Sequence, residues 1–231
     1  MDATAWIALW AFSFLASHLI ISSSIVRARL IGAVGDQPYR GIYSLVAAAT
    51  LGPLIYEFAR NKHAGPILWY LRAVAPIRWL AWILMLAAFI LFVGSFINPN
   101  PGGMAAAGRD STEPRGILKI TRHPSFVAFS LFGIAHILMN GWAGDVIFFG
   151  MFPALGIIGG MHQDQRKIRE LGERYRAFLA KTSLMPFAAL LSGRVQWTSN
   201  DMPWTAIGAG VVLTVAIVAL HPLMFGGNPL G

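Results

Sequence analysis

Six histidines are the residues of this chain most able to do chemistry. They are His18, His63, His123, His136, His162 and His221. The sequence contains no cysteine, which excludes disulfides, thiolate metal sites, iron–sulfur clusters and haem attachment through C-x-x-C-H. No phosphate-binding glycine loop, G-x-S-x-G or H-E-x-x-H motif occurs either. Neutral imidazole binds haem iron and other metals well, so histidine-based chemistry is the first possibility to consider.

Two of these histidines lie well inside apolar stretches, where an ionisable residue is costly and indicates a function by default. Counting from the expected inner ends of their stretches, His18 lies ~12 Å deep and His136 ~18 Å deep at 1.5 Å per residue. Two imidazoles at similar depth on different helices can ligate one haem iron. The alternative is that each ring is buried alone and bonded to a neighbouring serine or carbonyl, and depth does not decide between the two.

A second group of polar residues lies at the cytoplasmic ends of two apolar stretches. They are Arg122, His123, His162, Asp164 and Arg166. Arginine forks suit an anionic group such as a haem propionate or a phosphate. The alternative is simple anchoring at the membrane interface. We expect Arg122, His123, Asp164 and Arg166 to converge in space, because one stretch begins where the other ends.

The remaining ionisable residues carry weaker expectations. We expect His63 to lie in a solvated outer loop and His221 to be structural. Glu57 is the one acidic residue that we expect near the interior of a span, and it could reach the interface.

The composition indicates a membrane protein. Hydrophobic residues make up 56% of the 231 positions and charged residues 12%, whereas a soluble domain has about 25% charged residues. About 20 apolar residues cross a bilayer as a helix. Six stretches approach that length: Trp6–Val26, Gly41–Ala59, Trp79–Ile97, Ser125–Gly141, Asp145–Gly160 and Trp204–Phe225. We therefore expect an all-α, polytopic membrane helix bundle of about six transmembrane helices, forming a single domain over residues 1–231.

The basic residues predict the orientation. Fourteen of the 18 lysines and arginines fall in segments that share one side when the N-terminus is outside, and four fall on the other side. The positive-inside rule then places both termini outside the cytoplasm. The net charge of +8 has no nucleic-acid-binding motif beside it, so the partner we expect is membrane lipid and not nucleic acid. Nothing in the sequence points to a protein partner.

Two segments are not expected to span. Asn98–Gly116 is rich in proline and glycine, which predicts a cytoplasmic loop. Gln163–Lys181 spaces Ile168, Leu171, Tyr175 and Phe178 on one helical face opposite lysines and arginines. This pattern predicts a cytoplasmic amphipathic helix, lying either on the membrane surface or against the bundle.

Several motifs, in one order along nearly the whole chain, resemble the NnrU family. They are Ser17-His18, Val26-Arg27-Ala28-Arg29-Leu30, Tyr39-Arg40-Gly41-Ile42-Tyr43-Ser44, Asn98-Pro99-Asn100-Pro101, Gly116-Ile117-Leu118-Lys119-Ile120-Thr121-Arg122-His123-Pro124, Ala135-His136-Ile137-Leu138-Met139-Asn140-Gly141, Thr182-Ser183-Leu184-Met185-Pro186-Phe187 and Leu220-His221-Pro222. The resemblance implies a bacterial inner-membrane protein associated with nitrite and nitric oxide reduction in denitrification.

The NnrU family is similar to the membrane zeta-carotene isomerases, which bind haem b. Their pattern has a first-helix His, R-H-P, A-H and H-x-D-x-R, which match His18, His123, His136 and His162 to Arg166. The likeness implies His18 and His136 as haem ligands, and a lipophilic polyene as a possible substrate of a cis–trans isomerase. A remoter likeness, to isoprenylcysteine carboxyl methyltransferases, lacks their paired glutamates, since Gln163-Asp164-Gln165 stands there. A methyltransferase and a non-enzymatic membrane accessory protein remain the alternatives.

Overall fold

The protein is built from helices. The computed structural model describes residues 2–98, 100, 113–227 and 229. The longer helices are α1 (Ala3–Ser22), α2 (Ser24–Val34), α3 (Asp36–Arg60), α4 (Ala75–Ile97), α6 (Pro124–Met139), α7 (Ala143–Leu171) and α10 (Trp204–Phe225). The short ones are η1 (Leu71–Ala73), α5 (Ile117–Ile120), α8 (Glu173–Lys181), α9 (Ala188–Leu191) and η3 (Ser199–Asp201). One isolated bridge, between Ile67 and Trp142, is the β-pairing in the described part of the chain.

The long helices confirm the predicted polytopic membrane bundle. Within the described residues, α1, α3, α4, α7 and the segment Ser199–Phe225 are long and apolar enough to cross a bilayer. The predicted fourth span is α6, which has only 16 residues. Large apolar side chains such as Phe12 and Val212 are about 70% exposed (71% and 69%). Lipid is the solvent that such surfaces require, and helices satisfy their own backbone polar groups in it.

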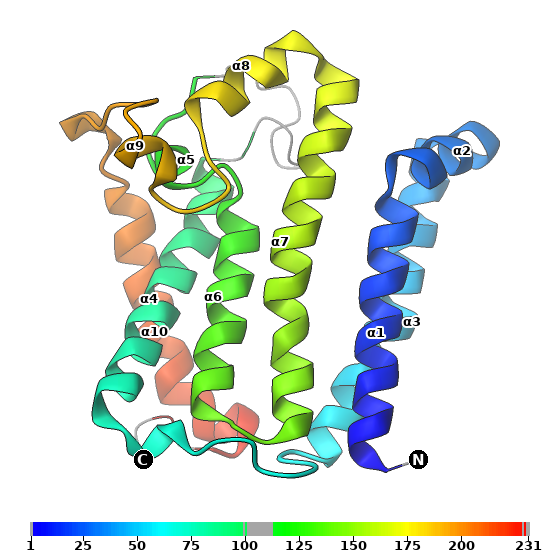
Figure 1. The fold of residues 1–231 in the computed structure, drawn as a ribbon, viewed down its shortest axis with the longest axis vertical. Coiled ribbons are helices and arrows are strands. Elements are labelled where there is room, and N and C mark those ends of the chain that lie inside the picture. The colour runs from blue at the N-terminus through cyan, green and yellow to red at the C-terminus, as the bar shows by residue number, and fades with distance from the viewer. Residues whose placement is uncertain (1, 99, 101–112, 228, 230–231) are drawn as a thin grey trace.

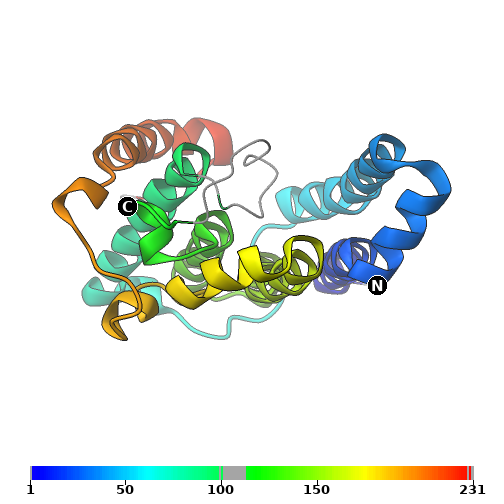
Figure 2. The same cartoon turned by 90° about the horizontal axis from the view of Figure 1, so that it is seen from above.

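The helices form an open row whose order differs from their order in the chain. Each packs on the next in the sequence α10, α4, α6, α7, α1, α3, as Figures 1 and 2 show. Residues 61–74 connect α3 to α4 by crossing the outer ends of α7 and α6. There Leu68 N–H donates to Gly141 O (2.7 Å) and Trp69 Nε1–H donates to Ile137 O (3.0 Å). This crossing places α1 and α3 on the far side of α7 from α4.

Glycines allow α6 and α7 to approach closely. A Cβ atom at Gly133 would lie 2.5 Å from Phe149 O, and one at Gly156 would lie 2.6 Å from Phe126 O. Small residues at such positions let helix backbones pack together in membranes, where van der Waals contact supplies much of the attraction. Gly141 is equally constrained, because its Cβ would lie 2.0 Å from Trp69 O in the crossing segment.

Two predicted boundaries were wrong. The first span ends at Ser22 and not at Val26, because Ser23 is extended (φ −60°, ψ 146°) and α2 begins after it. The Ser22 and Ser23 hydroxyls donate to Leu19 O and Ile20 O, the local bonding by which serine competes with a helix.

The predicted amphipathic helix Gln163–Lys181 is also not one helix. Its first half continues α7 to Leu171, and Gly172 (φ 58°) then turns the chain into α8. Glycine adopts this left-handed conformation without the strain that a Cβ would bring. The fifth span is therefore longer than Asp145–Gly160. Most of the predicted loop Asn98–Gly116, including Arg109, lies outside the described residues.

The topology can be tested with reporter fusions. Both termini lie at one end of the bundle, and α2, α8 and α9 lie at the other (Figure 1). With the orientation that the basic residues predict, a fusion after Gly193 reports cytoplasm and a fusion at the C-terminus reports the outside. A cytoplasmic C-terminus together with a cytoplasmic Gly193 would contradict this topology.

The α6–α7 contact can be tested by comparing two glycine substitutions that both lie on α7. Gly156→Ala places a Cβ 2.1 Å from Ser130 Oγ, whereas nothing lies within 4 Å of a Cβ at Gly150. Overpacking costs about 1–3 kcal/mol, while alanine in an open helical position gains up to about 1 kcal/mol over glycine. We expect thermal unfolding in detergent to show a lower midpoint for Gly156→Ala and an equal or higher one for the control Gly150→Ala. Equal midpoints for the two variants would contradict the packing.

Candidate functional site

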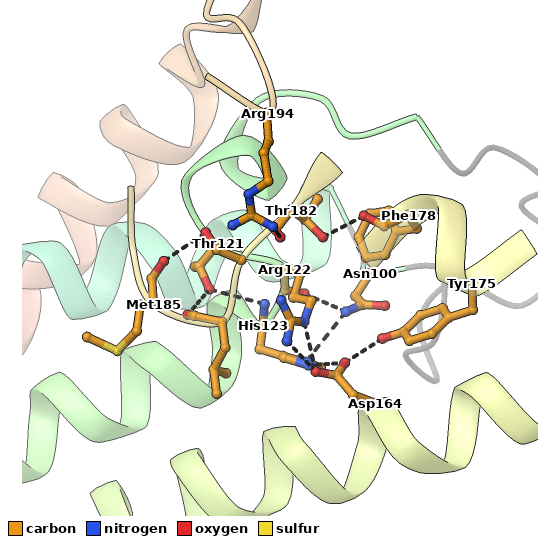
Figure 3. A network of polar contacts seen from close by, with 12 residues as sticks. Asn100, Thr121, Arg122, His123, Asp164, Tyr175, Phe178, Thr182, Met185 and Arg194 are labelled. Atoms are coloured by element: carbon orange, nitrogen blue, oxygen red, sulfur yellow. Dashed lines mark hydrogen bonds and ion pairs between the residues drawn. The ribbon is translucent and has the colours of Figure 1, made fainter. Parts of the chain in front are cut away.

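Asp164 is the centre of a polar cluster where α6 begins. His123 Nε2–H donates to Asp164 Oδ1 (2.8 Å), and Arg122 donates through Nε and Nη2 to Asp164 Oδ2 (2.8 and 2.6 Å). The Tyr175 hydroxyl of α8 also donates to Oδ1 (2.8 Å). Figure 3 shows these side chains pointing toward one carboxylate from three parts of the chain. The predicted convergence of Arg122, His123 and Asp164 is confirmed.

The cluster is buried and electrically balanced. His123 is 2% exposed and Tyr175 is fully buried. The charge of Arg122 offsets that of Asp164, and four donors satisfy the carboxylate. His123 Nδ1 lies 3.5 Å from the side-chain nitrogen of Asn100. Burial, and then the nearby Asp164 charge, raise the pKa of Tyr175, so its hydroxyl remains a donor.

The chain after α8 closes the cluster from the other side. Arg122 N–H donates to Ser183 O (2.9 Å), and Thr121 Oγ1–H donates to Leu184 O (2.8 Å). Arg194 donates from Nη1 to Thr182 O (3.0 Å). These bonds fix the Thr-Ser-Leu-Met-Pro-Phe segment against the start of α6. The cluster therefore clamps α6, α7 and α8 together at one membrane face.

His162 and Arg166 do not join this cluster. At 100° per residue, positions two before and two after Asp164 project from the opposite side of α7. Accordingly, Arg166 makes its ion pair with Glu170 (3.7 Å). The expectation that Arg166 converges on Asp164 was wrong, because the H-x-D-x-R spacing divides these residues between two faces of one helix.

His18 and His136 have separate surroundings. The His18 ring lies against Phe14 and Tyr43, with centroids 4.4 and 4.8 Å away. His136 Nδ1–H donates to Phe132 O (2.9 Å), and its ring stacks on Phe149 (4.5 Å, 22°). That bond leaves His136 Nε2 available as an acceptor or ligand. Within the described residues, no hydrogen bond or ring contact joins the two histidines.

Helices α1 and α6, which carry these rings, both pack on α7, and these contacts allow the depths of the two histidines to be compared. On one flank Ile7 packs at the level of Gly144, and on the other Gly133 packs between Phe149 and Pro153. At 1.5 Å per residue, His18 then lies about 16 Å above the level of Gly144 and His136 about 6 Å above it. These two levels differ by about 10 Å. Because α1 ends at Ser22, His18 lies about 6 Å from that end of its helix and not ~12 Å, whereas the estimate for His136 is unchanged because α6 begins at Pro124.

Within the described residues no contact brings His18 and His136 together, so we assign no catalytic step to the haem that the resemblance implies. No group of three or more metal-binding side chains occurs among the described residues either. The haem ligation stays a prediction.

His63 and Asp145 form a further polar pair, at the end of the bundle opposite the Asp164 cluster. The sequence did not predict this pair. His63 Nδ1 lies 2.6 Å from Asp145 Oδ2, and the ring packs against Trp142 at 4.2 Å. Asp145 is 1% exposed, so Glu57 is not the only acidic residue near a span interior. The sequence features that could have indicated this pair are a carboxylate at the start of an apolar stretch and a histidine in a loop expected at the same face.

His221 has a local role. Its Nδ1–H donates to Gly227 O (2.7 Å), and its ring lies against Phe225, as expected for a structural residue.

The fold and the clamp define the class of this protein, a multi-span membrane protein in which an Arg–His–Asp–Tyr cluster fixes one end of the helix bundle. The family described as NnrU protein matches residues 6–229. The chain belongs to the NnrU family.

Two curated relatives come from plants. The chain is 27% identical, over 90% of its length, to "15-cis-zeta-carotene isomerase, chloroplastic" of Arabidopsis thaliana, and 26% identical, over 83% of its length, to the protein of the same name from Zea mays. These matches cover 58% and 53% of the relatives, so the chain spans little more than half of their length. No solved structure matches it.

Removing the charge of Asp164 tests the clamp. Asp164→Asn leaves Arg122 buried without an opposite charge, which costs about 3–5 kcal/mol. We expect a large fall in the free energy of unfolding in detergent and faster proteolysis within α8. The control Glu173→Gln removes a carboxylate that is 92% exposed and pairs with Arg176, which costs less than about 1 kcal/mol. A stable Asp164→Asn protein would show that the cluster does not hold α8.

Proposed function

We propose that this protein is a membrane-embedded isomerase that acts on a carbon–carbon double bond of a lipophilic polyene. The observation that carries the proposal is its similarity, over 90% of the chain, to a curated 15-cis-zeta-carotene isomerase. A cis–trans isomerisation adds and removes no atoms or electrons overall. The protein must bind the polyene and lower the barrier to rotation about one bond.

The surroundings of His136 support this proposal. Rings of α3, α6 and α7 gather near it: Phe58 stacks on Phe148 (3.9 Å), and Phe149 stacks on His136. Flat aromatic rings offer favourable contacts to a conjugated chain, and the region is otherwise apolar. The half-buried His136 is the ionisable group in contact with these rings, and Phe132 O fixes its orientation.

The polar clamp supports no second function. Arg122 and His123 would be the anion-binding residues of a methyltransferase site, yet both already donate to Asp164. An association with nitrogen-oxide respiration has no counterpart among the described contacts.

The proposal is tested by expressing the protein in cells that accumulate 15-cis zeta-carotene and separating the isomers by chromatography. We expect the 15-cis isomer to fall and its trans product to rise. His136→Ala should lower the rate at least about tenfold, or about 1.4 kcal/mol of barrier. His221→Ala, whose ring bonds Gly227 O just beyond the end of its own helix, is the control. No isomer change with well-folded wild-type protein would overturn the proposal.

Haem b is tested separately by the visible spectrum of the purified protein. If the spectrum is lost in both His18→Ala and His136→Ala, then α1 and α6 approach more closely than they do in this structure. A haem spectrum that neither variant changes would contradict the predicted ligands.

A further inference from the structure

Two polar atoms on one face of α7 are buried without a protein partner. They are His162 Nδ1 and Arg166 Nε, and they are the buried side-chain nitrogens and oxygens left unbonded within the described residues. Four positions apart, their side chains lie one above the other on the helix. Burying an unsatisfied polar group costs about 1–3 kcal/mol, and more when it is charged. Two such groups together indicate a missing partner and not a local packing fault.

The neighbours of Arg166 supply too little negative charge. Glu170 is the nearest carboxylate, but its contact with Arg166 is 3.7 Å, beyond hydrogen-bonding distance. The same carboxylate lies closer to Arg27 (3.1 Å) and Lys167 (2.6 Å). Arg27 also lies 3.6 Å from Asp36, which pairs with Arg40 (2.7 Å). Two carboxylates thus serve four cations, which leaves a local excess of positive charge.

Helix α3 faces this excess with two tyrosines. Helix α3 packs on α7, and Tyr39 lies beneath Arg27, whose guanidinium carbon is 5.5 Å from the ring centroid. The Tyr39 hydroxyl already donates to Ile21 O (3.2 Å), whereas Tyr43 makes no hydrogen bond within the described part of the chain and packs its ring against His18. A hydroxyl, a guanidinium and an imidazole are thus present on α3 and α7 for an oxyanion with several acceptor oxygens.

We propose that the phosphate of a membrane phospholipid binds between α7 and α3, held by Arg166 and His162. An arginine fork matches phosphate oxygens, and a tetrahedral anion can reach donors one helical turn apart. The lipid source follows from depth. The site lies at the same end of the bundle as α2 and α8, where the headgroups of one leaflet would lie, and Figure 2 shows α2 joining α1 and α3 there.

The side chains farther into the membrane fit the acyl chains of such a lipid. Ile158 lies one turn before His162 on the same face of α7 and is 41% exposed. A headgroup site with an exposed apolar residue one turn below it suits a lipid better than free phosphate. This inference does not depend on the proposed isomerase activity.

The test uses delipidated full-length protein in detergent, titrated with dioctanoyl phosphatidylglycerol and followed by native mass spectrometry. We expect one tightly retained lipid on the wild type and at least tenfold weaker retention on Arg166→Gln. Arg166→Lys keeps the charge but loses the fork, and should be intermediate. The matched control is Arg169→Gln on the same helix, since Arg169 bonds Ser24. It should bind within about twofold of the wild type.

Two further probes separate the possible ligands. Dioctanoylglycerol, which has the same chains without phosphate, should not be retained, and equal retention would overturn the proposal. Displacement of the lipid by millimolar inorganic phosphate would assign the site to the free anion and overturn the lipid assignment. Equal retention by the wild type and Arg166→Gln, with unchanged melting of the lipid-free proteins, would show that the two unbonded atoms are met by water alone.

Discussion

The carboxylate of Asp164 is the group on which the inner half of the structure depends. It accepts hydrogen bonds from Arg122, His123 and Tyr175, so one side chain ties α6, α7 and α8 together. A charge in such a buried place is tolerated only when its partners are complete. This condition fixes the start of α6, the turn at Gly172 and the position of the segment that follows α8. Arg122 and His123 are residue types that suit an external anion, but here they bind the protein's own carboxylate.

The second constraint acts at the opposite face. The segment between α3 and α4 crosses the ends of α6 and α7, and the backbone of Trp69 passes so close to Gly141 that no side chain would fit. This crossing separates the N-terminal helices from α4 and places α7 between α1 and α6. As a result, polar residues of α7 face two different environments. Asp164 faces a closed clamp, whereas His162 and Arg166 face α3, where Glu170 is shared among three cations.

Membership of the NnrU family and the similarity to plant carotene isomerases are compatible with this arrangement, but the shared motifs do not by themselves assign a function to each residue. The shared motifs include residues with structural tasks: Arg122, His123 and Asp164 form the clamp, and His221 bonds the end of its own helix. A motif residue is thus not by itself a ligand or a catalyst. Among the histidines of the motifs, His136 is the one whose ring lies within an aromatic cluster, with a carbonyl to orient it.

The sequence by itself determined the kind of the elements and their assembly into a membrane helix bundle, because apolar runs of about 20 residues have one stable form in a bilayer. It also determined that Arg122, His123 and Asp164 meet, since adjoining spans bring their ends together. It did not determine the helix break at Ser23 or the continuous α7. Both depend on local backbone features, hydroxyl bonding at the serines and the positive φ of Gly172, which the hydropathy of the sequence does not record. Only the tertiary structure decided which histidines are neighbours. The order of helices in the row depends on one crossing segment, and no periodicity in the sequence records it. The pairing of His63 with Asp145 and the separation of His18 from His136 both follow from that order.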